Sequence, residues 1–248
     1  MVTRLESSDK TETVGAIVDF VRNRLGAPSE WIRTVGYPNS LALCVIDSIF
    51  STGQHYNAVR NVVGNYSAAV SRDQEHKFEP GSISELLYTF EAAGSSGEWA
   101  INVAKNKKPA HTRPGAVLKA EVVWQAAQLL VTAAVNTVED LRASDPEHLE
   151  KLQAGWKNLP SQRSGVTFNY FLILAGMQGI KLDRMVERFV AEIPGTKLAG
   201  ACSRVVLECL HEAASELEVQ PRDLDHVMWR FASKRQFLLA DPERPEEA

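Results

Sequence analysis

The sequence predicts an all-α protein, because apolar residues recur at helical spacing almost throughout and no segment alternates apolar and polar positions with turns at hairpin spacing. The chain has 248 residues, of which 44% are hydrophobic and 23% charged, enough to bury one large domain or two small ones. Roughly ten helices joined by short loops rich in Gly and Pro indicate a helical fold with more than one layer.

Start and stop signals define these helices in order. An apolar stripe over residues 14–25 ends at Gly26, which begins a turn. Ser82 and Glu85 have the spacing of a capping box, and Gly94 stops the helix that they open. We predict helices over residues 14–25, 41–51, 56–69, 83–93, 98–108, 114–130, 147–156, 166–175, 183–193, 198–217 and 221–237.

The net charge of −4 is mildly unfavourable for binding nucleic acid, but the charges are unevenly distributed. Four acidic residues and one Arg lie in the tail 241–248, which leaves −1 on the rest of the chain. Residues 155–188 carry a net charge of +3, and residues 105–113 hold four Lys or Arg and no acid. A solvated loop is the simplest interpretation of either basic segment taken alone.

Several classes of protein are excluded by what the sequence lacks. No apolar run approaches the roughly 20 residues needed to span a bilayer, and residues 1–12 are polar and acidic, unlike a secretion signal. Cys44, Cys202 and Cys209 are too few for a disulfide framework or a four-ligand metal site, so we interpret them as reduced core thiols. The His spacing of zinc hydrolases and the Gly-rich loops of nucleotide-binding proteins are also missing. The sequence therefore predicts a soluble cytoplasmic protein that needs no metal or cofactor.

The stretch 159–190 is the most informative part of the chain. It contains a turn led by Pro160, an apolar helix, a Gly-rich connection and then Asp183 at the head of another helix. This order resembles the helix–hairpin–helix module of the base-excision DNA glycosylases related to endonuclease III. Their pattern (V/L)-D-x-x-(V/I)-x-R matches residues 182–188, and Gly165, eighteen residues before Asp183, falls where bifunctional members carry a Schiff-base Lys.

The resemblance implies a two-lobed fold for this chain. Residues 38–178 would form a helical barrel that ends in the helix–hairpin–helix module, and residues 1–37 with 179–240 would form the second lobe, followed by a disordered acidic tail at 241–248. An extruded nucleotide would enter the cleft between the lobes. The implied partner is double-stranded DNA with a damaged or modified base, bound by a monomer associated with the nucleoid. No Cys quartet follows the last helix, so the iron–sulfur cluster of endonuclease III is not expected.

The same resemblance makes Asp183 the catalytic residue. Cleavage of an N-glycosidic bond builds positive charge on the sugar, and a nearby carboxylate stabilises that charge and orients water. Because Gly165 offers no amine to attack the sugar, the enzyme would be monofunctional, with water as the nucleophile. The simpler alternative for Asp183 is a plain N-cap of the helix that follows it.

Residues that contact DNA are expected on two further segments. Residues 41–61 resemble the family's early helix and its inserted turn, with Phe50 at the place of the inserted side chain, although an apolar residue such as Phe50 more often belongs to a core. Asp47 lies in an apolar run and needs a partner if it is buried. The hairpin lacks the family's glycines, so side chains such as Arg163 would replace backbone contacts. The residues expected to bind DNA are Asp47, Phe50, Ser51, Gln54, His55, Gln162, Arg163, Ser164, Gly165, Thr167, Asn169 and Arg184.

Two other functions remain open from the sequence. One is a non-enzymatic DNA-binding protein on the same fold, in which Asp183 is only a cap, and the other is a helical protein–protein adaptor. Within the glycosylase interpretation, uracil, an alkylated purine and a bulky modified cytosine suit the expected pocket about equally well. Repair of the genome and defence against foreign DNA are both consistent with the sequence.

Overall fold

The structure is a computed structural model that describes residues 5–33, 35–72 and 78–239. Within these ranges the regular secondary structure is helical, apart from isolated bridges between Trp31 and Leu238 and between Pro109 and Leu118. The predicted all-α class is therefore confirmed. The acidic tail predicted at 241–248 lies outside the described residues. Of the helices in the described part of the chain, none is long and apolar enough to cross a membrane.

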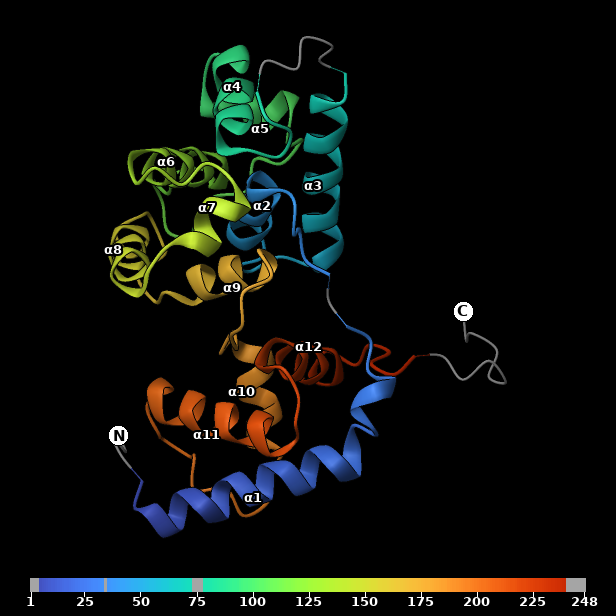
Figure 1. The fold of residues 1–248 in the computed structure, drawn as a ribbon. Helices are drawn as coiled ribbons and strands as arrows, with labels where there is room; N and C mark the ends of the chain where they lie inside the picture. The colour runs from blue at the N-terminus through green and yellow to red at the C-terminus, as the bar shows by residue number, and fades with distance from the viewer. Residues whose placement is uncertain (1–4, 34, 73–77, 240–248) are drawn as a thin grey trace. The chain divides into compact units, whose positions relative to one another are not determined.

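The chain divides into two compact units, which we call unit 1 (Met1–Thr34 with Gln178–Ala248) and unit 2 (Val35–Met177). In sequence, unit 2 is therefore inserted into unit 1. Each unit has its own hydrophobic core. The elements of both units are drawn in Figure 1.

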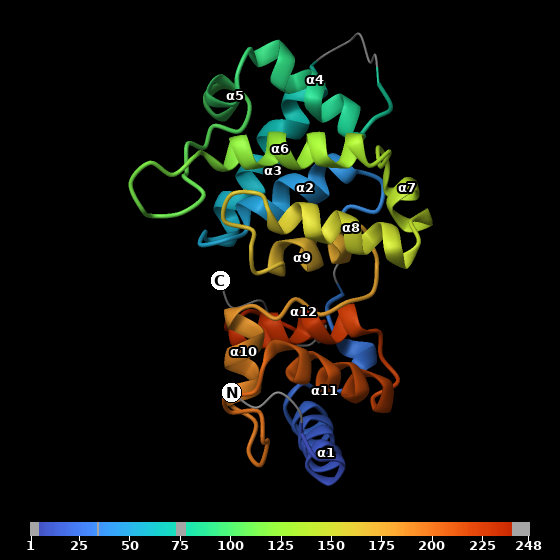
Figure 2. The same cartoon turned by 90° about the vertical axis from the view of Figure 1, so that its left-hand side faces the viewer.

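Unit 2 is organised around α2, in which nine of the ten residues are buried. A helix that is buried on all sides needs neighbours on all sides, and α2 packs against α3, α4, α6 and α9. Figure 2 shows these helices around α2, with α8 beside α9. The helices of unit 2 are α2 (Leu41–Phe50), α3 (Tyr56–Val70), α4 (Ile83–Ala93), α5 (Ser96–Asn102), α6 (Lys119–Thr132), α7 (Val138–Ala143), α8 (Pro146–Lys157) and α9 (Val166–Leu174).

The two ends of unit 2 meet at Gly36. The backbone N–H of Tyr37 donates to the carbonyl oxygen of Leu174 over 2.7 Å, so the start of the unit is bonded to the end of α9. Gly36 has φ of +61°, and a Cβ at this position would collide with the same carbonyl oxygen. Only Gly satisfies both requirements, since other residues rarely adopt positive φ and none could avoid the collision.

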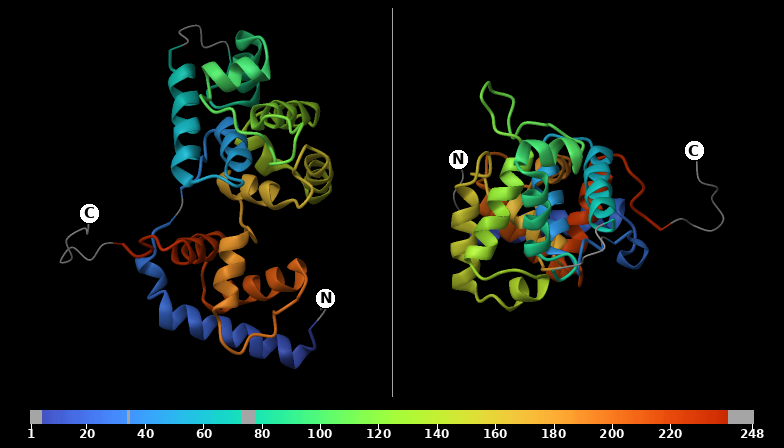
Figure 3. Two further views of the ribbon diagram at one scale, coloured as in Figure 1. Left: turned by 180° about the vertical axis from the view of Figure 1, so that it is seen from behind. Right: turned by 90° about the horizontal axis from the view of Figure 1, so that it is seen from above.

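Unit 1 combines the first helix with the last three. Helix α1 packs along α11, and α10 packs against α12; the left view of Figure 3 shows α1 in blue beside α11 in orange-red. Phe189 lies at the centre of this core, with its ring edge against the rings of Phe20 and Phe231. The elements of unit 1 are α1 (Ser7–Arg24), the 3₁₀ turn η1 (Pro28–Glu30), α10 (Arg184–Ala191), α11 (Ser203–Glu216) and α12 (Pro221–Ala232).

The helix α6 begins at Lys119, so the prediction that it starts at Pro114 is wrong. The residues before it are held in an extended arrangement by the bridge between Pro109 and Leu118 and by a bond of 2.9 Å from the N–H of Lys119 to the carbonyl of Lys108. Tertiary pairing thus overrides the tendency of Pro to occupy the first turn of a helix.

Two other differences from prediction have local causes. Helix α1 starts two turns earlier than predicted, because Lys10 binds Glu212 of α11 and a bond from Thr11 to Ser7 supports the first turn. Helix α7 was not predicted; its six residues are too few for a periodic pattern, and a capping box between Thr137 and Asp140 opens it.

Two glycines of unit 2, one at the end of α4 and one inside α3, give a direct test of the structure. Gly94 caps α4 with φ of +85°, whereas Gly64 lies inside α3, and a Cβ at either position meets no atom within 4 Å. Gly94→Ala should destabilise unit 2 by about 1 kcal/mol, because the left-handed conformation disfavours a Cβ. Gly64→Ala should stabilise it by about 0.5–1 kcal/mol through helix propensity.

Thermal unfolding of the two variants measures this difference. Melting temperatures should move in opposite directions by about 2–4 °C per kcal/mol. Shifts of the same sign would mean that one of the two glycines has a different backbone conformation from the one described.

Candidate functional site

The hairpin between α8 and α9 has the conformation of two successive tight turns. The N–H of Gln162 donates to the carbonyl of Leu159 over 3.1 Å, and the N–H of Gly165 donates to the carbonyl of Gln162 over 3.0 Å. Ser161 has φ of +67° and Gly165 has φ of +75°. Ser161 therefore adopts a left-handed conformation that usually needs Gly, at a cost of roughly 1–2 kcal/mol.

A chain of buried hydrogen bonds holds the hairpin against the ends of its two helices. The indole N–H of Trp156 donates to the hydroxyl of Thr167 over 3.0 Å, and that hydroxyl donates to the side-chain oxygen of Gln162. The amide of Gln162 donates to the carbonyl of Pro160 over 3.1 Å. Gln162 and Thr167 were expected to contact DNA, but both side chains are buried and are used in fixing the hairpin.

The tip of the hairpin exposes Arg163 and Ser164, while Asn169 is half-buried in α9. Gly165 is buried under the side chain of Lys157, and a Cβ at Gly165 would lie 2.8 Å from Cε of that lysine. Of the residues expected to bind DNA in the hairpin and α9, Arg163 and Ser164 are thus the ones whose side chains are exposed.

The turn after α2 is fixed by a buried lysine at the start of α6. The ammonium group of Lys119 donates to the carbonyl oxygens of Ile49 and Phe50 over 3.1 and 3.0 Å, and it also binds both oxygens of Thr52. The side chain of Phe50 is fully buried in the core, so it is not available to stack on a base as expected. Sequence analysis missed the role of Lys119, for which a lysine at the head of an apolar helix is the only local signal.

The side chains of this turn differ in exposure. His55 is exposed and precedes α3, whereas Ser51 and Gln54 are half-buried. The hydroxyl of Ser51 donates to the carbonyl of Ser48 over 2.9 Å. His55 is therefore the residue of this turn with a side chain that most fully faces solvent.

Asp47 is buried, and it has the partner that its burial requires. The hydroxyl of Tyr37 donates to Oδ2 of Asp47 over 2.8 Å. Burial raises the pKa of the Tyr37 phenol, and the charge of Asp47 raises it further. The pair therefore links the first residues of unit 2 to its central helix, which is a structural role that the sequence had left open.

Asp183 belongs to unit 1, where it is the N-cap of α10. Its Oδ1 accepts bonds from the backbone N–H groups of Met185 and Val186 over 2.8 and 3.2 Å. Its Oδ2 lies 3.8 Å from the ammonium group of Lys181, and its side chain is 21% exposed. The carboxylate is thus fixed by one oxygen, while the other faces the mostly buried ammonium group of Lys181. Arg184, the next residue, is exposed.

A second carboxyl group, that of Asp225, shares Lys181 as a partner with Asp183. Asp225 of α12 is buried, and its Oδ1 accepts a bond of 2.7 Å from the backbone N–H of Lys181. Burial raises the pKa of Asp225 to about 7; the charge of Asp183 acts in the same direction, and the bond and charge of Lys181 act in the opposite direction. Asp225 therefore fixes the backbone two residues before Asp183, a connection that sequence analysis did not find.

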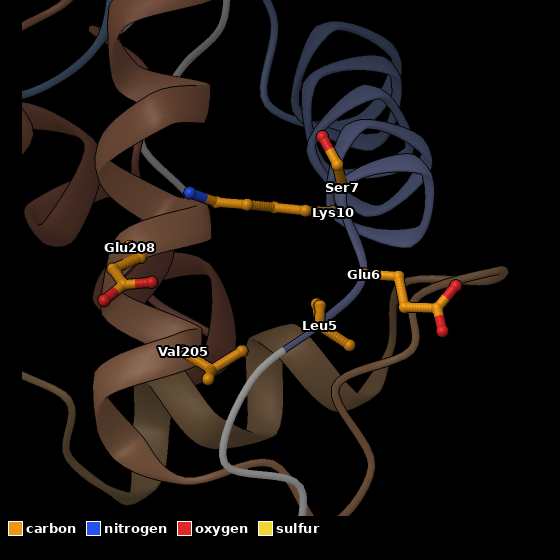
Figure 4. Close-up of a pocket in the computed structure, with 6 residues that line it drawn as sticks. All are labelled: Leu5, Glu6, Ser7, Lys10, Val205 and Glu208. Carbon is orange, nitrogen blue, oxygen red and sulfur yellow. The ribbon is translucent and has the colours of Figure 1, made fainter.

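Two hollows within the units include no residue predicted to bind DNA. One, of about 630 Å³, lies between the start of α1 and α11, where Lys10 extends across the opening (Figure 4). The other, of about 370 Å³, lies among α3, α4 and α5. Most of the side chains that line it are apolar, and the carboxyl group of Glu85 is a polar exception. Neither hollow is therefore part of the candidate site, whose residues lie at turns and helix ends.

Titration of Asp225 gives a prediction for stability. Because its pKa is about 7 in the folded protein and about 3.9 in an unfolded chain, the folded protein binds one more proton between these values. The free energy of unfolding should then fall as pH rises from about 4 to about 7, by up to about 1.4 kcal/mol per pH unit. Urea denaturation of the wild type and of Asp225→Asn measures the slope, which the variant should lose. An unchanged slope in the variant would assign the proton to another group.

The comparison with protein families matches residues 15–233 to a family described as "Domain of unknown function (DUF8548)". Among curated proteins no match is found. The matched range includes residues of both units and every residue named above as part of the candidate site. Because the match spans most of the sequence, the chain belongs to this family of domains of unknown function.

Proposed function

We propose that this protein is a monofunctional DNA glycosylase, which extrudes a damaged or modified base from duplex DNA and hydrolyses its N-glycosidic bond. The observation that carries the proposal is the carboxylate of Asp183. It combines the sequence pattern of a glycosylase Asp with a position at a helix N-terminus and a partly exposed side chain. Arg163 and Ser164 at the hairpin tip are the proposed phosphate contacts.

Hydrolysis of an N-glycosidic bond is favoured by a fixed negative charge close to the sugar. As the bond between C1′ and the base nitrogen breaks, its electron pair leaves with the base and positive charge develops on the sugar ring. A water oxygen then forms the new bond to C1′ and gives up a proton to solvent, while the departing base takes one up, so that OH is added to the sugar and H to the base. Two backbone N–H groups hold Oδ1 of Asp183, so the carboxylate needs little reorganisation when the sugar charge develops.

The partners of Asp183 also suit this role. The dipole of α10 favours a negative charge at its N-terminus. Lys181 at 3.8 Å and the bond from its backbone to Asp225 restrict the segment that carries Asp183. A preorganised carboxylate of this kind stabilises a developing cation more than a freely rotating one does.

Two observations in unit 2 support binding to DNA. The hairpin keeps a tight turn without the glycines of the related hairpins, because Ser161 adopts a left-handed conformation itself and Gly165 adopts a second one. Lys119 holds the turn at residues 51–55 through its backbone, which leaves His55 exposed for contact with a strand.

A non-enzymatic DNA-binding protein is the second candidate. It is favoured by the two cap bonds and the Lys181 pair, which by themselves give Asp183 a complete structural role. In that case Asp183 would stabilise α10, and no base would be released.

The central prediction uses Asp183→Asn. The wild type is incubated with duplexes that carry uracil, alkylated purines or bulky modified cytosines, and with heavily modified phage-type DNA, and abasic sites are counted after alkali treatment. On the duplex that reacts, Asp183→Asn should lower the single-turnover rate at least about a hundredfold, because the charge is lost. The melting temperature should barely change, since Asn caps a helix nearly as well as Asp.

Asp145→Asn is the matched control. Asp145 is the N-cap of α8 and accepts a bond of 2.7 Å from the N–H of His148, so the substitution changes a cap in the same way elsewhere in the chain. Its rate of base release should equal that of the wild type. If Asp183→Asn also cleaves like the wild type, Asp183 has no part in catalysis; if no duplex reacts, the non-enzymatic candidate is favoured.

A separate prediction concerns the products. Gly165 provides no amine, so borohydride should trap no covalent complex and the product strands should stay intact until alkali is added. The nearest amine is that of Lys157, whose Nζ would lie 3.7 Å from a Cβ at Gly165. A trapped complex that disappears in Lys157→Gln would contradict the monofunctional assignment.

A further inference from the structure

A basic loop, which we define as residues 103–118, connects α5 to α6 in unit 2. It contains Lys105, Lys107, Lys108 and Arg113, and no acidic residue lies between Glu98 and Glu121 in the sequence. Figure 2 shows the loop extending away from the helices of the unit. The proposed glycosylase chemistry makes no use of this concentration of positive charge.

All four basic side chains of the loop are exposed. Within the described residues, none of the four forms an ion pair with a carboxylate, in contrast to Lys151 of α8, which lies 2.7 Å from Glu147. Unneutralised charges at such density repel one another and attract a polyanion.

The loop is nevertheless well anchored by its backbone. The N–H of Ala110 donates to the carbonyl of Val117 over 2.8 Å, and the N–H of Asn106 donates to the carbonyl of Ala100 over 2.8 Å. The side chain of Asn65 in α3 donates to the carbonyl of Ala104 over 3.1 Å. These bonds fix where the charges are held, so binding a polyanion would cost little ordering of the backbone.

Lys119 connects the loop to the turn after α2. Its backbone N–H donates to the carbonyl of Lys108 over 2.9 Å, while its ammonium group binds the carbonyls of Phe50 and Thr52. One buried residue therefore joins the base of the basic loop to the turn that carries His55. The two segments belong to the same surface region of unit 2.

We propose that the basic loop binds the phosphates of duplex DNA, in a contact that takes no part in the chemistry proposed for Asp183. The charge and the anchoring of the loop favour this partner, because a DNA backbone offers phosphates at regular spacing to several cations at once. The contacts carry no sequence information and serve to position the protein on the duplex. The inference needs DNA binding by unit 2 but does not need base release.

The test neutralises two of the loop's charges. Lys107→Gln with Lys108→Gln leaves Lys105 in place, since Lys105 has φ of +50° and its substitution would alter a strained turn. The matched control is Arg72→Gln with Lys151→Gln, which removes two exposed charges from other parts of unit 2. Binding of a short unmodified DNA duplex labelled with fluorescein is measured by anisotropy at salt from about 50 to 200 mM.

The loop variant should lose roughly two units of the slope of log K against log salt, and its affinity near 0.1 M salt should fall roughly tenfold for each phosphate that it no longer neutralises. The control should keep the slope of the wild type. An equal slope in wild type and loop variant, or an absence of DNA binding by the wild type, would overturn the inference.

A second arm uses vesicles of phosphatidylserine mixed with phosphatidylcholine. If the loop variant loses vesicle binding and keeps its DNA slope, the loop is a membrane contact and the inference is wrong. The proposed glycosylase activity is tested apart from this, because no base release is needed for the anisotropy measurement. A loop that binds DNA in a protein that releases no base would support the inference and reject the enzyme.

Discussion

The burial of the Lys119 ammonium group is the constraint on which much of unit 2 depends. A charged group in a protein interior needs several partners, and Lys119 finds them in the carbonyls of Ile49, Phe50 and Thr52. The carbonyls of Ile49 and Phe50, at the end of α2, would otherwise have no helical donor. The cation also lies at the negative end of that helix. One side chain thus satisfies both requirements and determines where α2 ends, where α6 begins and how the intervening turn is directed.

The fold follows from the sequence where local rules decide it. Ser82 accepts the bond of 3.2 Å from Glu85 that its spacing predicts, and Gly94 adopts the left-handed conformation expected of a helix stop. The second half of the predicted capping box is absent, because the Glu85 side chain accepts from the N–H of Gly81 and not of Ser82. Segments governed by distant partners, such as the extended approach to α6, were predicted wrongly, since nothing in the local sequence encodes a bond to Lys108.

The residues of the candidate site show the same difference between features set by local sequence and features set by distant partners. The position of Asp183 at the head of a helix and the need of Asp47 for a partner were readable from the residues, because the first depends on the next few positions and the second on the apolar run around Asp47. Asp225 lies more than forty residues from Lys181 in the sequence, yet their bond is 2.7 Å long, and no periodic pattern relates them. Whether a large apolar residue such as Phe50 is buried or exposed is decided by the packing of the whole unit, and here it lies in the core.

The closure of unit 2 at Gly36 affects the order in which parts of the chain can fold during synthesis on the ribosome. With its two ends bonded to each other, unit 2 is complete as soon as α9 has emerged, whereas α1 must wait for α11. Ser203 is synthesised long after Arg24, and at about 5–20 residues per second this delay lasts roughly 10 to 40 s. During that time the apolar stripe of α1, with Val14, Ile17 and Val21, has no α11 to cover it. The nascent chain therefore carries an uncovered apolar stripe on α1 throughout this interval, which is the kind of surface that favours aggregation during folding.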